Sequence, residues 1–178
     1  MKVPSLHSLL IDKQWSLKSM HSSDKAFHIS SGNGESVWMN GDLYSVLIDP
    51  CVAQGQLSIL EAIIPPGGGP PRHNHLNEDE IFYVTHGQLD ISAGDDTFIA
   101  KAGSLVFVPR GMMHGFRNNT KDFAKQLLIF TPGGFERFFL EVGLTASAGR
   151  PIPEVSSTNQ EVARLIGAKY GSYQEDKI

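Results

Sequence analysis

The fold of this chain is decided by two segments: GGGPPRHNHLNEDEIFYVTHG (residues 67–87) and GSLVFVPRGMMHGFRN (residues 103–118). They contain four side chains of the kinds that bind divalent metals: His73, His75, Glu80 and His114. A His-x-His pair on a strand places both imidazoles on one face, because side chains alternate along a strand. Imidazole and carboxylate groups are usual ligands of borderline divalent metals. These residues therefore predict a metal site.

The four candidate ligands cannot lie on one continuous strand. Glu80 has the wrong parity to share a strand face with His73 and His75. Residues 76–79 must therefore turn or bulge and return Glu80 beside the histidines from the next strand. His114 lies much further along the chain and must come from a separate hairpin. Three imidazoles and one carboxylate directed inward would leave one or two positions open on a metal that takes five or six ligands.

Around these segments, the chain consists of short apolar runs separated by turn residues. Each run is rich in β-branched or aromatic residues and is bounded by Gly, Asn, Asp or Pro, a pattern typical of strands. The predicted strands are Val37–Met39, Leu43–Ile48, Leu57–Ile64, Ile81–Val84, Leu89–Ser92, Thr97–Ala100, Leu105–Val108, Gly115–Arg117 and Phe123–Phe130. Many short strands without intervening helices predict an all-β sandwich or barrel.

The pattern changes after the last predicted strand. Phe135, Phe138 and Phe139 recur at three- and four-residue spacing, which predicts one stripe of a short helix that ends at Gly143. We interpret this stripe as core packing and not as a cofactor site. The chain is thereby divided into an N-terminal arm (residues 1–31), a β-barrel (residues 32–132) and a C-terminal helical extension (residues 133–178).

A second helix is predicted within the C-terminal extension. Ser157 or Thr158 would cap its start, and it would stop near Gly171. The residues predicted for its buried face are Val162, Leu165 and Ile166.

Composition excludes several classes of protein. The 178 residues carry a net charge of −4 without a basic block, so nothing indicates a nucleic-acid partner. No apolar run reaches the length of a membrane span or of a signal-peptide core, and we therefore expect a soluble cytoplasmic protein with no membrane partner. Cys51 is the only cysteine, which excludes an intramolecular disulfide and thiolate zinc motifs.

The two segments resemble the two motifs of the cupin superfamily. The glycines, histidines and glutamate of the first motif are matched by Gly67, His73, His75, Glu80 and Gly87, and the second motif is matched by Gly103, Pro109, Gly111, His114 and Asn118. The resemblance implies an all-β cupin double-stranded β-helix, or jelly-roll barrel, here followed by short C-terminal α-helices. It also implies one divalent metal ion per chain, bound by His73, His75, Glu80 and His114. The ion could be Fe, Mn, Ni, Zn or Cu.

A looser resemblance covers most of residues 31–143. The segments 37–44, 78–84 and 130–136 are similar to single-domain cupins of the quercetin 2,3-dioxygenase-like group. By that resemblance, Glu80 would be both a metal ligand and the catalytic base that takes a proton from a substrate hydroxyl. This makes a metal-dependent dioxygenase acting on a planar aromatic or enol substrate the first hypothesis.

An apolar pocket would suit such a small-molecule substrate. Strand parity directs Phe82 and Val84 to the face of Glu80 and Phe116 to the face of His114, and Phe107 and Met113 are possible additions to the pocket. Each of these side chains could equally be plain barrel core.

Two other functions remain open. The first is another metal-dependent cupin enzyme, an isomerase or decarboxylase acting on a small acid or sugar, which would need an inward Arg or Lys. Arg72 and Arg117 neighbour ligand-face residues and should point away, so Arg110 or Lys125 would have to reach the metal. The second is a non-catalytic cupin that binds a small molecule.

The chain is also expected to form a homodimer. The strands Ile81–Val84 and Leu127–Phe130 are apolar on both faces, so their outer side needs cover. The N-terminal arm or the C-terminal helices could contribute to that contact.

Overall fold

The computed structural model describes residues 26, 28–147, 152–153 and 157–175. The predicted N-terminal arm, residues 1–31, therefore lies almost wholly outside the described residues. The side chains of Ser157 and Thr158, the two predicted helix caps, also lie outside them.

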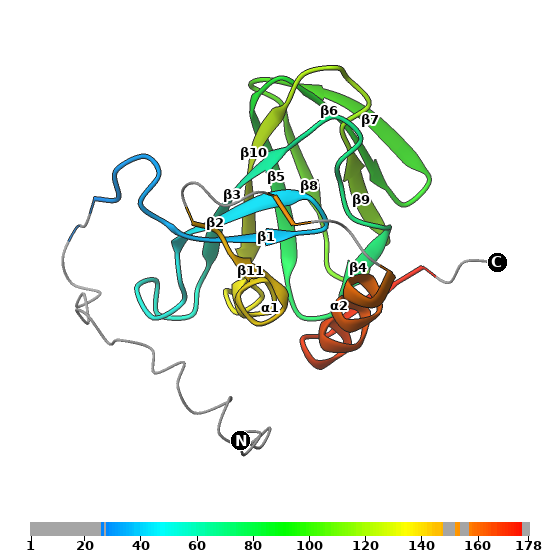
Figure 1. Ribbon diagram of the computed structural model, residues 1–178. Helices are drawn as coiled ribbons and strands as arrows, with labels where there is room; N and C mark the ends of the chain where they lie inside the picture. Colours follow the sequence, from blue (N-terminus) through cyan, green and yellow to red (C-terminus); the bar gives the residue numbers. More distant parts are fainter. Residues whose placement is uncertain (1–25, 27, 148–151, 154–156, 176–178) are drawn as a thin grey trace, which may run out of the picture.

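Two antiparallel sheets face each other and form a jelly-roll barrel (Figure 1). The seven-stranded sheet has the order β11-β1-β2-β3-β10-β5-β8. Its strands are β1 (Glu35–Met39), β2 (Asp42–Ile48), β3 (Ser58–Ile64), β5 (Asp79–His86), β8 (Leu105–Val108), β10 (Ala124–Thr131) and β11 (Leu144–Thr145). The five-stranded sheet has the order β12-β4-β9-β6-β7. Its strands are β4 (His73–His75), β6 (Gln88–Ala93), β7 (Asp96–Lys101), β9 (His114–Arg117) and β12 (Ser172–Gln174). The predicted all-β fold is confirmed.

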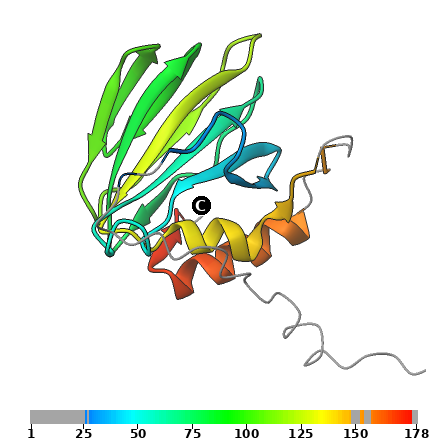
Figure 2. The same cartoon turned by 90° about the vertical axis from the view of Figure 1, so that its left-hand side faces the viewer.

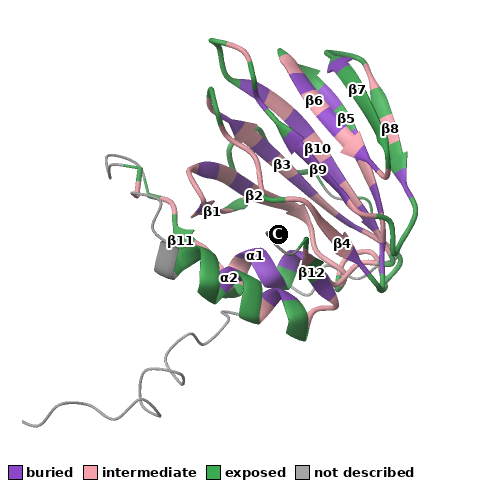
Figure 3. Ribbon diagram, turned by 90° about the vertical axis from the view of Figure 1, so that its right-hand side faces the viewer, coloured by how far each residue is buried: buried purple, intermediate pink, exposed green. Residues whose placement is uncertain are grey.

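The core lies between the sheets because buried and less buried residues alternate along the central strands (Figure 3). The buried positions of β3 and β10 are Ser58, Leu60, Ala62, Ile64, Ala124, Gln126, Leu128 and Phe130. Gly87, between β5 and β6, has a φ of +71°, and a Cβ there would lie 2.9 Å from the carbonyl oxygen of Phe123. Only glycine fits this turn without strain.

The short strands β11 and β12 were not predicted. Each is defined by its pairing with a strand from a distant part of the sequence: β11 pairs with β1, and β12 pairs with β4. A run of two or three residues has too few positions to show a periodic pattern.

The two helices are α1 (Glu136–Val142) and α2 (Ser157–Lys169), and both lie across one end of the barrel (Figure 2). The predicted buried face of α2 is partly wrong: Val162 is 43% exposed and Leu165 is 59% exposed, whereas Ala163 is buried and Ile166 is half-buried. The small residues Ala163 and Gly167 face inward because they allow close packing, and a Cβ on Gly167 would lie 3.7 Å from the Phe138 ring. No helix in the described part of the chain is long and apolar enough to cross a membrane.

Candidate metal centre

The four candidate ligands come from three strands and both sheets. His73 and His75 lie on β4, and His114 lies on β9, where it pairs directly with His73. Glu80 lies on β5 of the opposite sheet. The break between β4 and β5 is the turn that the parity of Glu80 required, because it carries the chain from one sheet to the other. The cluster therefore lies between the two sheets.

The ligand atoms of this cluster converge closely. One nitrogen or oxygen from each of the four side chains lies within 4.8 Å of the other three. The Oε2 atom of Glu80 is 2.7 Å from Nε2 of His114 and 3.3 Å from Nε2 of His75. His75, Glu80 and His114 are buried, whereas His73 is partly exposed. Three ligands are thus enclosed and the fourth lies nearer to solvent.

Backbone carbonyls fix the orientation of two of the imidazoles. The Nδ1–H of His73 donates to the carbonyl oxygen of Pro71 at 2.9 Å, and the Nδ1–H of His114 donates to that of Met112 at 2.8 Å. A carbonyl oxygen can only accept, so Nδ1 carries a proton in both rings, and Nε2 is the ring nitrogen left to bind an ion. Metal-binding histidines usually have this kind of support from a backbone carbonyl.

The charges in the cluster are those of a metal site. Burial opposes ionisation of Glu80, but the neighbouring His114 and His75 imidazoles outweigh it and hold the pKa of Glu80 well below its ordinary value. Burial and the neighbouring imidazoles lower the pKa of His73, which keeps this ring neutral. The hydrogen bond to Glu80 raises the pKa of His114 in spite of burial. The cluster thus presents an ionised carboxylate and a neutral imidazole, the forms that coordinate metals.

The donor set fits a divalent metal ion. Among the described residues, neither ring nitrogen of buried His75 has a hydrogen-bond partner. A buried polar group without a partner costs free energy, and an ion at this point would bind the Nε2 atom. Three imidazoles and a carboxylate suit zinc, iron, nickel, manganese or copper, and they do not select among these metals.

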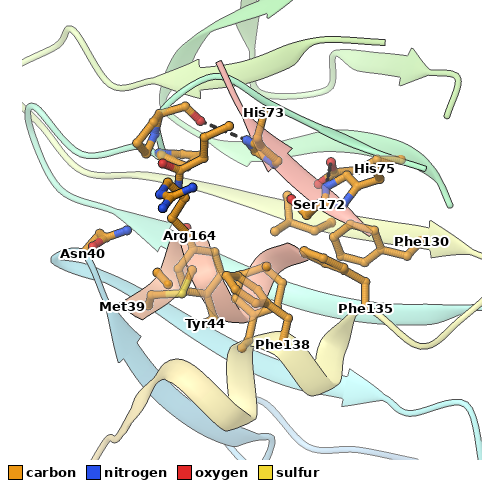
Figure 4. Close-up of a pocket in the computed structure, with 18 of the residues that line it drawn as sticks. Met39, Asn40, Tyr44, His73, His75, Phe130, Phe135, Phe138, Arg164 and Ser172 are labelled. Carbon is orange, nitrogen blue, oxygen red and sulfur yellow. Dashed lines mark hydrogen bonds and ion pairs between the residues drawn. The ribbon is translucent and has the colours of Figure 1, made fainter. Parts of the chain in front are cut away.

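A cavity with an empty volume of about 570 Å³, partly open to solvent, borders the cluster. His73 and His75 form part of its wall (Figure 4), and so does Glu80. Six aromatic side chains form much of the rest: Tyr44, Phe116, Phe130, Phe135, Phe138 and Phe139. The Phe135 and His75 rings lie 4.0 Å apart between centroids. Flat apolar surfaces thus extend directly from the candidate ligands.

The structure changes most of the predicted pocket. Phe116 lines the cavity, but Phe82 is fully buried and packs against the His114 and Phe116 rings, with 5.8 Å between centroids in each case. Val84 is also fully buried core, and Met113 is half-buried outside the cavity wall. Phe107 is wrong as a pocket residue: it is 54% exposed, because Val106 and Val108 occupy the inward positions of β8.

The C-terminal extension supplies cavity residues that the sequence reasoning missed. Phe135, Phe138 and Phe139 are buried in the core, which confirms the predicted packing, and they also line the cavity, which was not predicted. Their helical spacing was visible in the sequence. The packing of α1 against the cluster was not, because it depends on how the extension folds back over the barrel.

A buried carboxyl group lies beside the cavity. The hydroxyl of Tyr44, which lines the cavity, donates to Oδ2 of Asp42 at 3.2 Å, and both side chains are buried. Burial raises the pKa of Asp42 from 3.8 to about 7, although hydrogen bonds from Tyr44 and the Gly69 backbone act in the opposite direction. The folded protein therefore holds this proton more tightly than the unfolded chain does.

This raised pKa predicts how stability changes with pH. Between about pH 4 and pH 7 the unfolded chain loses the Asp42 proton while the folded protein keeps it, so the free energy of unfolding falls as pH rises. The fall is at most about 1.4 kcal/mol per pH unit. Asp42→Asn should remove this contribution, and urea unfolding of both proteins at pH 4, 5.5 and 7 measures the difference. Parallel pH profiles for the two proteins would contradict it.

Comparison with known proteins agrees with this architecture. A family model described as "Cupin domain" matches residues 60–130, which include all four candidate ligands. The chain contains a cupin domain. A structure described as a predicted oxalate decarboxylase from Thermotoga maritima has a TM-score of 0.56 at 19% identity, and the match covers 60% of this chain and 99% of that one. At that identity the likeness shows the cupin fold alone.

Two curated relatives of this cupin carry different names. Quercetin 2,3-dioxygenase of Bacillus subtilis is 24% identical over 115 residues, which cover 65% of this chain and 34% of that protein. Acetate kinase EutQ of Clostridioides difficile is 28% identical over 104 residues, 58% of this chain and 60% of that protein. The chain thus spans less than two thirds of either relative. The family includes proteins named as enzymes, and membership does not decide among their activities.

Proposed function

We propose that this cupin is a metal-dependent dioxygenase that acts on a planar aromatic or enol substrate. One observation carries the proposal: an aromatic-walled cavity borders three of the four candidate ligands, so a flat molecule in the cavity would reach the metal. The similarity to quercetin 2,3-dioxygenase supports it, although the match covers only 34% of that protein.

The chain's own residues have separate tasks in this proposal. His73, His75, His114 and Glu80 would hold the ion. When bound, a divalent metal supplies Lewis acidity that favours the deprotonated form of a substrate hydroxyl. Glu80 is the only carboxylate in the described cavity wall, so its carboxylate is the acceptor for that hydroxyl proton. The aromatic walls would orient the ring and exclude water from it.

Oxygen uptake tests the proposal. We expect metal-loaded protein with saturating quercetin or another flavonol to consume oxygen, and Glu80→Gln to lower the rate by at least about 100-fold, because it removes both the general base and an anionic metal ligand. Glu61→Gln, on β3 outside the cavity wall, is the matched control and should leave the rate unchanged. Metal-loaded protein that binds a flavonol without any oxygen uptake would overturn the dioxygenase proposal.

The alternative function, an isomerase or decarboxylase that acts on a small acid or sugar, is not supported by Arg110 or Lys125. Arg110 binds Asp79 through Nε at 3.1 Å and a terminal nitrogen at 3.0 Å, and it does not line the cavity. Lys125 lies on β10 between the inward-facing Ala124 and Gln126, so it points away from the cluster. A non-catalytic binding cupin would use the same cavity, and the oxygen-uptake measurement separates it from the dioxygenase.

We also propose that a second copy of the chain covers the outer face of the seven-stranded sheet. Strand register aligns Ile59, Ile129, Ile81 and Phe107 in one apolar row. A neighbouring row contains Leu127, Tyr83 and Leu105. Glu61 and Lys125 lie on the same face with opposite charges, which allows the face to be complementary to itself about a two-fold axis.

Sedimentation of a charged variant tests the dimer. Phe107→Asp would place a carboxylate in the apolar contact, and we expect it to convert a dimer at micromolar concentration into a monomer. Ile99→Asp, on the exposed β7 of the other sheet, is the control and should remain dimeric. A wild-type protein that sediments as a monomer at this concentration would contradict the proposal.

A further inference from the structure

Three polar side chains of the cavity wall come from the C-terminal extension. Ser172 and Gln174 lie on β12, and Arg164 lies on α2. In the antiparallel pairing of β12 with β4, Ser172 is opposite His75 and Gln174 is opposite His73. Directly opposite residues point to the same face of a sheet, so these two polar side chains lie beside the candidate metal ligands.

Arg164 brings a positive charge to the cavity wall. It is the only Lys or Arg among the described residues that line the cavity. Figure 4 shows it near Asn40 in the view, on the side away from Phe130 and Phe135. The cavity therefore has an aromatic side next to the cluster and a cationic group elsewhere in its wall.

Glu161 holds this guanidinium in position. The Nε atom of Arg164 donates to Oε2 of Glu161 at 2.9 Å, and a terminal nitrogen donates to Oε1 at 2.7 Å. Both side chains are about half exposed, so the pair is solvated and its partners can exchange. A guanidinium has five N–H donors in a planar fork that matches a carboxylate. A ligand carboxylate can share these donors with Glu161 or displace it.

We propose that the ligand of this cavity is an aromatic compound that carries a carboxylate, and that Arg164 binds the carboxylate while the ring lies among the phenylalanines. Gln174 supplies an amide donor elsewhere in the cavity wall, beside His73. This inference deepens the proposed function, because it names the substrate class of the same cavity. It differs from the simple flavonol hypothesis in requiring a negative charge on the ligand.

A matched pair of ligands tests the role of Arg164. The probes are 3-hydroxy-2-naphthoate and 2-naphthol, which share a hydroxylated two-ring system and differ in the carboxylate. Calorimetric titration of the full chain at low salt should show that the naphthoate binds about tenfold tighter or more, the size expected of a charge-assisted hydrogen bond. The preference should weaken as salt concentration rises.

Variants assign the preference to one residue. Arg164→Leu should abolish the preference for the naphthoate and leave the affinity for naphthol within about twofold, and Arg164→Lys should restore part of it. Arg137→Leu is the matched control, because Arg137 is an exposed arginine on α1 that does not line the cavity. Equal affinities of wild-type protein for the two probes, or an unchanged preference in Arg164→Leu, would overturn the inference.

The same titration is made with metal-free and metal-loaded protein, so that the two proposals fail separately. The protein could prefer the naphthoate through Arg164 and yet consume no oxygen. This result would sustain the inference and refute only the dioxygenase. Oxygen uptake with uncharged flavonols, together with no preference for the naphthoate, would sustain the dioxygenase and refute the inference.

Discussion

We expect His114→Ala to abolish metal binding: the content measured by elemental analysis should fall from about one divalent ion per chain to less than about a tenth. His114 is buried, and its Nε2 atom lies 2.7 Å from Glu80 Oε2, at the centre of the candidate site. Loss of a residue that merely supports a ligand weakens metal binding by about 10–100-fold, and loss of the ligand itself should weaken it further. The protein is measured after loading with iron, nickel, manganese, zinc or copper in turn.

The control is His86→Ala. His86 ends β5 and stacks on Phe123, with 4.8 Å between ring centroids, away from the cluster. This variant should keep a full complement of metal. If His114→Ala fails to fold, Glu80→Gln gives the same information, because it preserves the volume of the side chain and removes the anionic ligand. Wild-type protein that takes up none of the five metals, or a His114→Ala variant that retains one ion per chain, would refute the metal site.

Phe135→Ala lowers the free energy of unfolding by about 3–5 kcal/mol, the usual loss for a large aromatic side chain removed from a core. Phe135 is 2% exposed and touches rings from the barrel and from α1. The centroid of its ring lies 5.2 Å from that of Phe130, 5.0 Å from that of Phe138 and 4.0 Å from that of His75. The deletion therefore opens a hole where the extension meets the candidate metal centre.

Phe98→Ala is the matched control for this prediction. Phe98 lies on the edge strand β7 and is 44% exposed, so its loss should change the free energy of unfolding by less than about 1 kcal/mol. Urea unfolding followed by circular dichroism measures both variants. Similar unfolding midpoints for Phe135→Ala and wild type would mean that the extension does not pack on the barrel as described.

The Phe135 prediction also bears on function. His75 lies between this phenylalanine and Glu80, so a cavity at residue 135 would let the imidazole move. Phe135→Ala should therefore lower both the metal affinity and the stability of the protein. Deletion of a core side chain far from the cluster would lower the stability alone. The C-terminal extension lies outside the matched cupin domain, residues 60–130, and it forms much of the cavity wall. Substrate preference in this chain is therefore expected to follow the extension more than the shared barrel.

Part of the candidate site was predictable because its information is local. The spacing of His73 and His75 places both rings on one strand face, and the parity of Glu80 required the turn that the structure contains. Short apolar runs between turn residues predicted most of the strands for the same reason: alternation and turn chemistry depend on neighbours in the sequence.

Other features depend on contacts between residues far apart in the chain. The strand β12 has no pattern of its own and forms against β4. The orientation of α2 follows from the fit of Ala163 and Gly167, not from the larger side chains Val162 and Leu165. Phe107 was a possible pocket residue, but the register of β8 turns it to the outer face. Each of these outcomes is decided by packing against a partner surface.

The sequence by itself determined the four candidate ligands, the all-β barrel and the presence of two C-terminal helices, because residue type, spacing and period carry that information. Only the tertiary structure decided that Glu80 faces the three histidines from the opposite sheet and that the C-terminal extension forms part of the cavity wall beside them. Arg164 illustrates the difference: it lies 84 positions after Glu80 in the sequence, and it reaches the same cavity only because α2 folds back over the end of the barrel.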